Sequence, residues 1–277
     1  MTSTPELLAF ALELADLADG ITMRHYRGGG DVWRKSDGTL VTLADTSTES
    51  AIRARILERF PDHAVEGEEE GLTLPPMPMD EPTDGSAEAA PPPDRVKWIV
   101  DPIDGTHNFA RGAPVWATLI ACEVNGRLEV GVASAPALGT RWWAARGEGA
   151  HRRDALTGIT ERIHVSTRAR LEDAQVLYGS YTLTMAAWGG RADRLLRASW
   201  RQRGFGDFWG HCLVAEGVAE VMLEGEIAPY DIAALMVIVE EAGGRMTDSE
   251  GAPRIDAGHC ITSNGVVHEE VLGVLGE

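Results

Sequence analysis

The segment that most limits how this chain can fold is WIVDPIDGTHNF, at residues 98–109. A short apolar run typical of a buried strand leads directly into Asp101 and Asp104, which are followed by Gly-Thr. Pro102 fixes the backbone φ angle after the first acid, and the three-residue spacing can turn both carboxylates to one side. Gly105 permits close approach of the backbone to a ligand. If this glycine begins a helical turn, the N–H groups of the turn form an anion site beside the acids, which predicts phosphate next to bound cations.

Four further acids stand at the boundaries of predicted elements, namely Asp45, Glu68, Glu69 and Asp231. Several like charges cannot share one pocket without a positive partner, because burying a carboxylate is costly and each one raises the pKa of its neighbours. Hard oxygen ligands select magnesium or a similar ion. Each acid also has an ordinary structural interpretation: Asp231 as a helix N-cap, Asp45 as the residue before a capping box, and GEEE as a solvated turn. The two interpretations differ in whether the acids converge.

Helical spacing of apolar residues predicts a first helix from Thr4-Pro5, with Thr4 as its cap, to the three glycines at 28–30. A second helix is predicted to begin at Thr46, which forms the S/T-x-x-E capping box with Glu49, and to end at Pro61. LVTLAD, just before it, has the pattern of a strand. The region 73–95 is rich in proline and acids and poor in bulky side chains, so a flexible loop is predicted there.

The rest of the chain alternates strand and helix patterns. TLIACEV and RLEVGVA are joined by Asn125-Gly126, a strong hairpin signal, and RWWAA is predicted to form another strand. AQVLYGS, WRQRGF, AEVMLE and HCITSNG also have strand patterns, whereas HCLVAEG and DIAALMVIVEEAGG are helical, the latter opened by Asp231. Early helices with an antiparallel sheet, followed by alternating elements, indicate layered α/β architecture.

The length and net charge of the chain limit its possible domain organisation and binding partners. A chain of 277 residues can form one large domain or two packed lobes. Its net charge of −18 argues against nucleic acid or an anionic membrane as a partner and leaves cations as candidates. The start carries acids and no cationic region, so neither a signal peptide nor a membrane span is predicted. With three widely spaced cysteines expected to be reduced, the protein is expected in the cytoplasm.

Other catalytic patterns find no support. The eight histidines show neither HxxxH nor Cys/His spacing, so structural roles are expected for them rather than zinc binding. The sequence also contains no GxSxG elbow and no Walker A loop, which disfavours the simplest covalent and nucleotide-hydrolysing mechanisms.

Four segments together resemble a known family: LVTLAD (40–45), GEE (67–69), WIVDPIDGTHNF (98–109) and PYDIAALMVIVEEAGG (229–244). Their sequence and order are similar to those of the inositol monophosphatase family of magnesium-dependent, lithium-sensitive phosphatases. The third segment is highly specific, and the likeness covers essentially the whole chain except the proline-rich loop. The resemblance implies an alternating α-β-α-β-α sandwich and a homodimer. It also implies a lobe at 1–180 carrying most metal ligands and a second at 181–277 that adds Asp231 and substrate contacts.

The resemblance also assigns metal ligands. Glu68, Asp101 and the carbonyl of Ile103 would hold a first Mg²⁺, and Asp101, Asp104 and Asp231 a second. Glu68 would help to hold a third, looser ion, and Mn²⁺ could substitute for Mg²⁺.

Catalytic roles follow from the same resemblance. Asp45, hydrogen-bonded to Thr106, would orient and deprotonate the attacking water, with Glu69 beside the metal ligands. The amides of Gly105 and Thr106 would bind phosphate oxygens. The residues expected around the substrate, a small phosphate monoester, are Asp104, Gly105, Thr106, Arg203, Gly206, Asp207, Phe208, Glu224 and Asp231.

Within the family, RGAPVWATLIA, SAPALGTRWWAARGEGA and GFGDFWGHCLVAEG resemble the bacterial histidinol-phosphatase branch. Acids at Asp207 and Glu224 suit the cationic amine and imidazole of histidinol phosphate better than a neutral polyol. The expected activity is therefore hydrolysis of histidinol phosphate, in histidine biosynthesis. Two alternatives remain: an inositol-1-phosphate or broad sugar-phosphate phosphatase, and a catalytically silent metal-binding relative.

Overall fold

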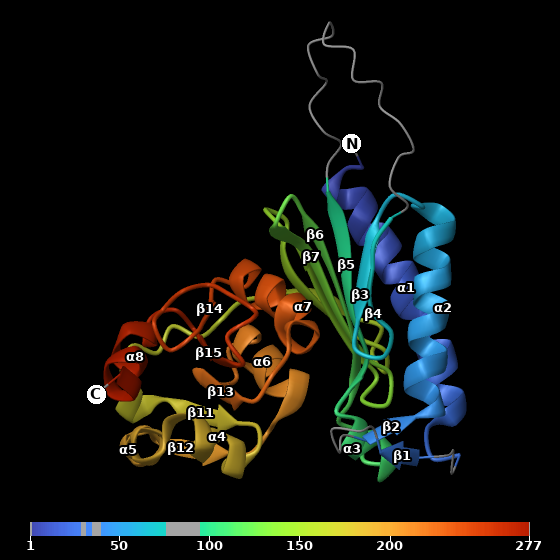
Figure 1. Ribbon diagram of the computed structural model, residues 1–277. Helices are drawn as coiled ribbons and strands as arrows, with labels where there is room; N and C mark the ends of the chain where they lie inside the picture. Colours follow the sequence, from blue (N-terminus) through green and yellow to red (C-terminus); the bar gives the residue numbers. More distant parts are fainter. Residues whose placement is uncertain (1, 29–31, 35–39, 76–94, 277) are drawn as a thin grey trace, which may run out of the picture.

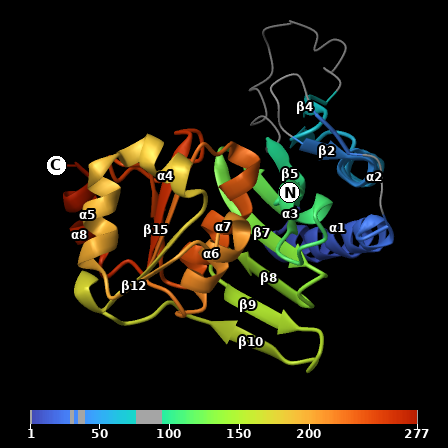
Figure 2. The same ribbon diagram turned by 90° about the horizontal axis from the view of Figure 1, so that it is seen from below.

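The computed structural model describes residues 2–28, 32–34, 40–75 and 95–276 of the chain. Within these residues two large β-sheets alternate with three layers of helices (Figures 1 and 2). This arrangement confirms the predicted α-β-α-β-α sandwich. Most of the predicted proline-rich loop, residues 76–94, lies outside the described part of the chain.

The larger sheet has eight strands in the order β10-β9-β8-β7-β6-β5-β3-β4. Its strands are β3 (Ala64–Gly67), β4 (Gly71–Thr73), β5 (Val96–Asp104), β6 (Ala117–Val124), β7 (Arg127–Ala135), β8 (Thr140–Ala145), β9 (Gly149–Asp154) and β10 (Thr160–Ile163). β3 and β5 run parallel, and the other neighbours pair antiparallel. The predicted β6–β7 hairpin is confirmed. Asn125 and Gly126 both have positive φ, 52° and 82°, as a tight primed turn requires.

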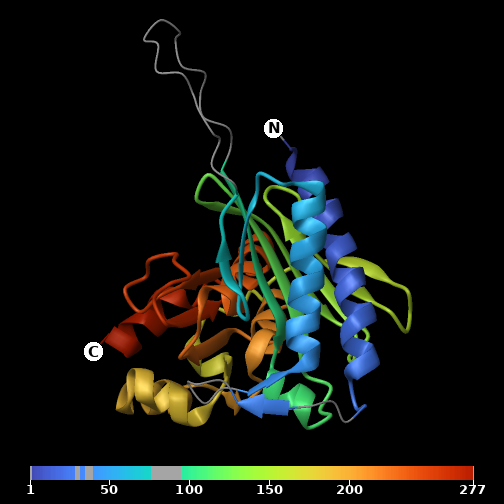
Figure 3. The same cartoon turned by 45° about the vertical axis from the view of Figure 1, so that its right-hand side comes forward.

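Two long helices, α1 (Thr4–His25) and α2 (Leu43–Arg59), lie side by side over the outer face of this sheet (Figure 3). Their apolar stripes bury Leu14 and Ile52 completely, and Trp98 of β5 belongs to the same cluster. The packing fixes the start of α2 against the end of β5, which is where the acidic residues lie.

The middle layer consists of α6 (Asp207–Ala215) and α7 (Pro229–Glu241), held between the two sheets (Figure 2). Residues 232–239 of α7 are all buried, because this helix packs against β-strands on one side and against α6 and β14 on the other. A helix that is apolar on every side needs such a central position.

The smaller sheet has the order β12-β11-β13-β15-β14. Its strands are β11 (Gln175–Tyr178), β12 (Arg201–Arg203), β13 (Val221–Gly225), β14 (Arg245–Thr247) and β15 (His259–Ser263). The outer helices are α4 (Tyr181–Trp188), α5 (Gly190–Ala198) and α8 (His268–Gly276), and a short 3-10 helix spans Leu171–Asp173. Elsewhere, β1 (Val32–Arg34) pairs with β2 (Leu40–Thr42), and α3 (Thr106–Ala110) follows β5.

Three predicted helix starts are wrong in detail. α1 is preceded by Ser3 as its N-cap, so Thr4 is its first residue. α2 begins at Leu43, and its capping box is formed by Thr42 and Asp45 instead of Thr46 and Glu49. Asp45 is therefore inside the helix and does not end a strand.

The third concerns α7, which begins two residues before Asp231 because Pro229 is well suited to a first helical turn. The division after residue 180 stays a prediction; the smaller sheet already begins at Gln175. Cys122, Cys212 and Cys260 are buried free thiols. Among the described helices, none combines the length and apolarity needed to cross a bilayer.

Candidate active site

The DPID segment does not simply follow its strand but forms the strand's last residues. The register of β5 against β6 shifts between Asp101, opposite Leu119, and Asp104, opposite Ala117, so β5 contains one extra residue. Residues three apart in a regular strand point to opposite faces, but one inserted residue restores them to the same side. This bulge is the local reason that the two carboxylates can converge.

A first group of carboxylates, which we call the strand-end group, consists of Asp101, Asp104 and Asp231, with ligand oxygens within 4.8 Å of one another. Each acid also accepts a backbone N–H: Asp101 from Ile103 at 2.9 Å, Asp104 from Phe208 at 2.7 Å, and Asp231 from the residue three before it at 2.7 Å. These bonds hold the acids without neutralising them, so the group remains suited to a cation.

A second group, the helix-start group, consists of Asp45, Glu68 and Glu69, again with oxygens within 4.8 Å of one another. Asp45 accepts the N–H of Thr42 at 2.8 Å and its hydroxyl at 2.5 Å through one carboxylate oxygen. The hydroxyl of Thr106 lies 3.2 Å from the other oxygen. Helix α2, the β3–β4 turn and α3 therefore meet at Asp45.

The two groups are electrostatic neighbours. Burial first, and then the charges of neighbouring acids, outweigh the hydrogen bonds that lower these pKa values, so that the pKa of Asp231 is raised to about 7 and that of Asp45 to about 6. Burial, followed by the charge of Glu68, also holds the pKa of Asp101 well above its ordinary value. Burial likewise raises the pKa of Asp104. This repulsion favours proton uptake or cation binding.

We expect Mg²⁺ to stabilise the protein more at about pH 8 than at about pH 5.5. With the pKa of Asp231 raised from 3.8 to about 7, the metal-free folded state binds the proton more tightly than the unfolded state. The contribution of Asp231 to the free energy of unfolding of the metal-free protein therefore falls as the pH rises toward and through about 7. A cation must displace these protons, so its own stabilisation grows over the same window. The measurement is Tm with and without Mg²⁺ at both pH values.

The change in Tm caused by Mg²⁺ at each pH is compared, because this subtraction removes the pH dependence of groups outside the site. One such group is His268, whose pKa is lowered by burial to about 4. An Mg²⁺-induced rise in Tm of equal size at both pH values would contradict proton displacement from these carboxylates.

The start of α3 has a backbone conformation that could serve an anion. Gly105 is its N-cap with φ of 84°, in the left-handed region, and a Cβ there would lie 3.0 Å from the carbonyl oxygen of Val115. Only glycine fits this turn without a shift of the neighbouring backbone. The first N–H groups of a helix have no partner within it, so those at the start of α3 can serve an anion next to Asp45 and Asp101.

A cleft of about 660 Å³ extends from this turn toward the smaller sheet. Gly105 lines one wall, and Gly206 and Asp207 line the other. Burial, followed by the charge of Glu224, raises the pKa of Asp207 to about 6. Asn108, also in the wall, donates to the carboxylate of Asp207 at 2.8 Å and joins the two sides.

The remaining predicted substrate residues have different environments. The ring of Phe208 is fully buried against Trp142, so it offers no side chain to a ligand; its backbone N–H instead holds Asp104. Arg203 is exposed on β12 and donates to the carbonyl of Gln202 at 2.6 Å. Glu224, on β13, lies beside the cleft residue Asp207.

The sequence prediction gave no site role to Asn108 and expected only a structural role for His211. His211 is fully buried, with one ring nitrogen 2.8 Å from the Thr262 hydroxyl and the other 2.7 Å from a carboxylate oxygen of Glu224. Asn108 stands within the quoted WIVDPIDGTHNF, so its place in the motif was a usable signal. Nothing in the spacing of His211 indicated a partner, because Glu224 lies on another element.

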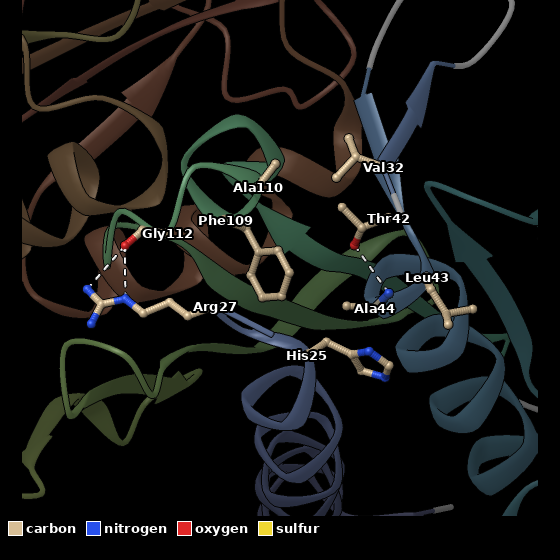
Figure 4. A pocket seen from close by; sticks show the side chains of 9 residues that line it. All are labelled: His25, Arg27, Val32, Thr42, Leu43, Ala44, Phe109, Ala110 and Gly112. Atoms are coloured by element: carbon tan, nitrogen blue, oxygen red, sulfur yellow. Dashed lines mark hydrogen bonds between the residues drawn. The ribbon is translucent and has the colours of Figure 1, made fainter. Parts of the chain in front are cut away.

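A smaller pocket of about 60 Å³ adjoins the start of α2 (Figure 4). Thr42 lines it, and its hydroxyl accepts the N–H of Ala44 at 3.2 Å, the contact drawn in the figure. Arg27 closes another side by donating to the Gly112 carbonyl. The pocket is too small for a phosphate monoester, and none of the clustered acids lines it.

Fold and site together define a class of protein: a layered α/β chain whose two carboxylate groups could hold metal ions beside an anion-binding helix start. A sequence model of the inositol monophosphatase family matches residues 4–276. The chain belongs to this family.

Comparisons with individual relatives support this family assignment. The chain is 40% identical to a histidinol-phosphatase of Streptomyces coelicolor, with 98% of this chain and 97% of the relative covered. It is also 40% identical to one of Mycobacterium tuberculosis, with 96% of each covered. A solved structure of the IMPase of Thermotoga maritima superposes with a TM-score of 0.78 at 31% identity, covering 98% of this chain and 97% of that one. The resemblance seen in the sequence, to the family and to histidinol-phosphatases within it, is confirmed.

Proposed function

We propose that this chain is a Mg²⁺-dependent phosphate monoesterase that hydrolyses histidinol phosphate to histidinol and inorganic phosphate. The observation that carries the proposal is the convergence of two carboxylate groups at the start of α3. The full-length similarity to histidinol-phosphatases directs it to this substrate.

The donor set fits magnesium, because every candidate ligand is a carboxylate or carbonyl oxygen. Glu68, Asp101 and the Ile103 carbonyl would hold one ion, and Asp101, Asp104 and Asp231 a second, with Glu68 shared by a third. Bound Mg²⁺ supplies positive charge that acidifies water and stabilises the departing ester oxygen.

The protein's own groups orient the reactants. Asp45 accepts the proton of the attacking water, and the hydroxyl of Thr106, 3.2 Å away, fixes that carboxylate. Glu69 lies in the same group and supports the ligands. The amides of Gly105 and Thr106 bind phosphate oxygens, which become more negative as the bond to the ester oxygen breaks.

Substrate choice would be made on the cleft side. Histidinol phosphate carries a cationic amine and an imidazole, and the cleft wall supplies Asp207, with Glu224 beside it. Opposite charge in a partly buried site favours such a ligand over an uncharged polyol. Gly206 lets its segment pack closely against Gly179, because a Cβ there would lie 2.9 Å from the Gly179 Cα. The exposed Arg203 is expected to contact the phosphate monoester from the solvent side.

We expect kcat/KM for histidinol phosphate to exceed that for inositol-1-phosphate by about a hundredfold or more, because the acids Asp207 and Glu224 attract the cationic amine and imidazole and have no opposite charge to attract in the polyol. The measurement is phosphate release from each substrate with and without Mg²⁺. A preference for inositol-1-phosphate would instead support the broader activity of relatives such as the Thermotoga maritima fructose-1,6-bisphosphatase/inositol-1-monophosphatase, 33% identical. Absence of Mg²⁺-dependent release from any monoester would indicate the catalytically silent alternative.

The free cysteines support a cytoplasmic location. The family resemblance supports four further proposals. The enzyme acts as a homodimer, Li⁺ inhibits it, and Mn²⁺ replaces Mg²⁺. Residues 1–180 form the lobe with most ligands, and residues 181–277 form the lobe that adds Asp231.

A further inference from the structure

Glu49 is a fully buried acid that the proposed mechanism does not use. It stands one turn after Asp45 on α2, and Arg53 stands one turn further, so the three side chains share one helix face. The carboxylate of Glu49 accepts the N–H of Glu69 at 2.7 Å and that of Glu70 at 2.9 Å. These two amides immediately follow Glu68 in the chain.

Arg53 holds the same turn from both ends. Its guanidinium pairs with Glu49 at 2.8 Å and donates to the Val65 carbonyl at 3.1 Å, before the turn. After the turn it donates to the Thr73 hydroxyl at 2.9 Å and to the Gly71 carbonyl. The pair is almost solvent-free, with side-chain exposures of 5% for the arginine and 0% for the glutamate.

The backbone is shaped to receive this carboxylate. A Cβ on Gly67 would lie 2.4 Å from the carboxylate carbon and from one oxygen of Glu49, so any larger residue would displace it. A buried ion pair is weak evidence for stability, because desolvation offsets its attraction. Placing a further acid next to the helix-start group therefore calls for a reason other than stability.

We propose that Glu49, held by Arg53, is a positioning residue that fixes the turn at residues 67–70, so that Glu68 and Glu69 face Asp45 before any cation binds. Mutual repulsion among these three acids pushes the turn away from α2, and the two amide bonds to Glu49 oppose that movement. The inference rests on the proposed function, since it deepens the account of the same metal site. Preorganised ligands bind an ion more tightly than ligands that must be gathered.

Glu49→Gln tests this directly. The amide keeps the size of the side chain but replaces one acceptor with a donor, so it cannot accept both turn N–H groups. The matched control is Glu220→Gln, because Glu220 is also buried and accepts the Gln175 N–H at 2.6 Å and the Ser166 hydroxyl at 2.8 Å, in the smaller sheet. A second variant, Arg53→Lys, keeps a cation beside Glu49, but its single ammonium group cannot make all of the arginine's bonds to the two ends of the turn at once.

The readouts are the Mg²⁺ dissociation constant by titration calorimetry on the resting enzyme, and the Mg²⁺ dependence of kcat. We expect Glu49→Gln to weaken Mg²⁺ binding by about 10–100-fold. Excess Mg²⁺ should restore kcat while the substrate KM stays unchanged. Arg53→Lys should shift Mg²⁺ binding in the same direction but less, and Glu220→Gln should leave it unchanged.

Two outcomes would overturn the inference while leaving the proposed function intact: Mg²⁺ binding by both Glu49→Gln and Arg53→Lys within twofold of wild type, or an equal loss in Glu220→Gln. If Glu49→Gln does not fold, the Mg²⁺ affinity of Arg53→Lys decides alone: weaker binding supports the inference, and binding within twofold of wild type overturns it. A wild-type protein that binds no Mg²⁺ would instead refute the proposed function and this inference with it.

Discussion

Asp101→Asn is expected to lower kcat/KM by about a thousandfold or more while the protein remains folded. Asp101 is the carboxylate shared by both proposed ions, and a bound ion stabilises the transition state by several kcal/mol. Asparagine has nearly the same shape and can still accept the Ile103 N–H, which now lies 2.9 Å from the carboxylate. Phosphate release from histidinol phosphate at saturating Mg²⁺ gives the effect on activity.

Thermal unfolding separates chemistry from folding in this variant. Removing one negative charge from the crowded strand-end group should leave the metal-free Tm equal to or above that of wild type, while the rise caused by Mg²⁺ is largely lost. Asp248→Asn serves as the control, since Asp248 is buried and accepts the N–H groups of Glu250 and Ala252 in a loop of the smaller sheet. Near-normal turnover by Asp101→Asn would contradict the proposed metal site.

Asp45→Asn is expected to lower kcat by roughly 10²–10⁴-fold, the usual contribution of a general base. The amide cannot take a proton from water at neutral pH, whereas the carboxylate of Asp45, with a pKa of about 6, can. The strand-end group is untouched, so Mg²⁺ should still raise Tm. Steady-state kinetics at saturating Mg²⁺, together with Tm with and without the ion, measure both effects.

Asp45 also closes the capping box of α2, so the control must remove the cap and keep the carboxylate. Thr42→Ala does this: it deletes the hydroxyl that lies 2.5 Å from Asp45 and should cost about 1 kcal/mol of stability. Its kcat should fall less than about tenfold, since the general base remains. Equal losses of kcat in the two variants would mean that Asp45 acts only through the structure of the helix.

The start of α2 shows why the sequence placed Asp45, a candidate catalytic residue, in the wrong element. Two overlapping patterns, Thr42 with Asp45 and Thr46 with Glu49, both satisfy the spacing of a capping box. Local sequence cannot choose between them. The fold chooses the first, because the Glu49 carboxylate binds the β3–β4 turn and is not available to the helix start.

Asp104 and Phe208 illustrate a different limit. The motif placed Asp104 among the predicted site residues, but the group that donates to its carboxylate, the Phe208 N–H, comes from a helix more than 100 positions later. The Phe208 side chain is buried because α6 packs between the two sheets. Similarity to a family motif therefore marks a residue as a candidate for the site, but it does not show whether the side chain or the backbone of that residue makes the contact.

The sequence alone determined the layered fold class, most strands and helices, the β6–β7 hairpin and the family, and it named the acids that are candidates for the site. These are local properties, set by hydrophobic period, turn residues and short spacings. The tertiary structure decided which acids share a group: the β5 bulge aligns Asp101 with Asp104, α7 packing delivers Asp231, and α2 brings Asp45 to Thr106, 61 positions away. Such contacts depend on how whole layers pack, and the spacing of residues along the chain does not directly encode which distant residues come together in space.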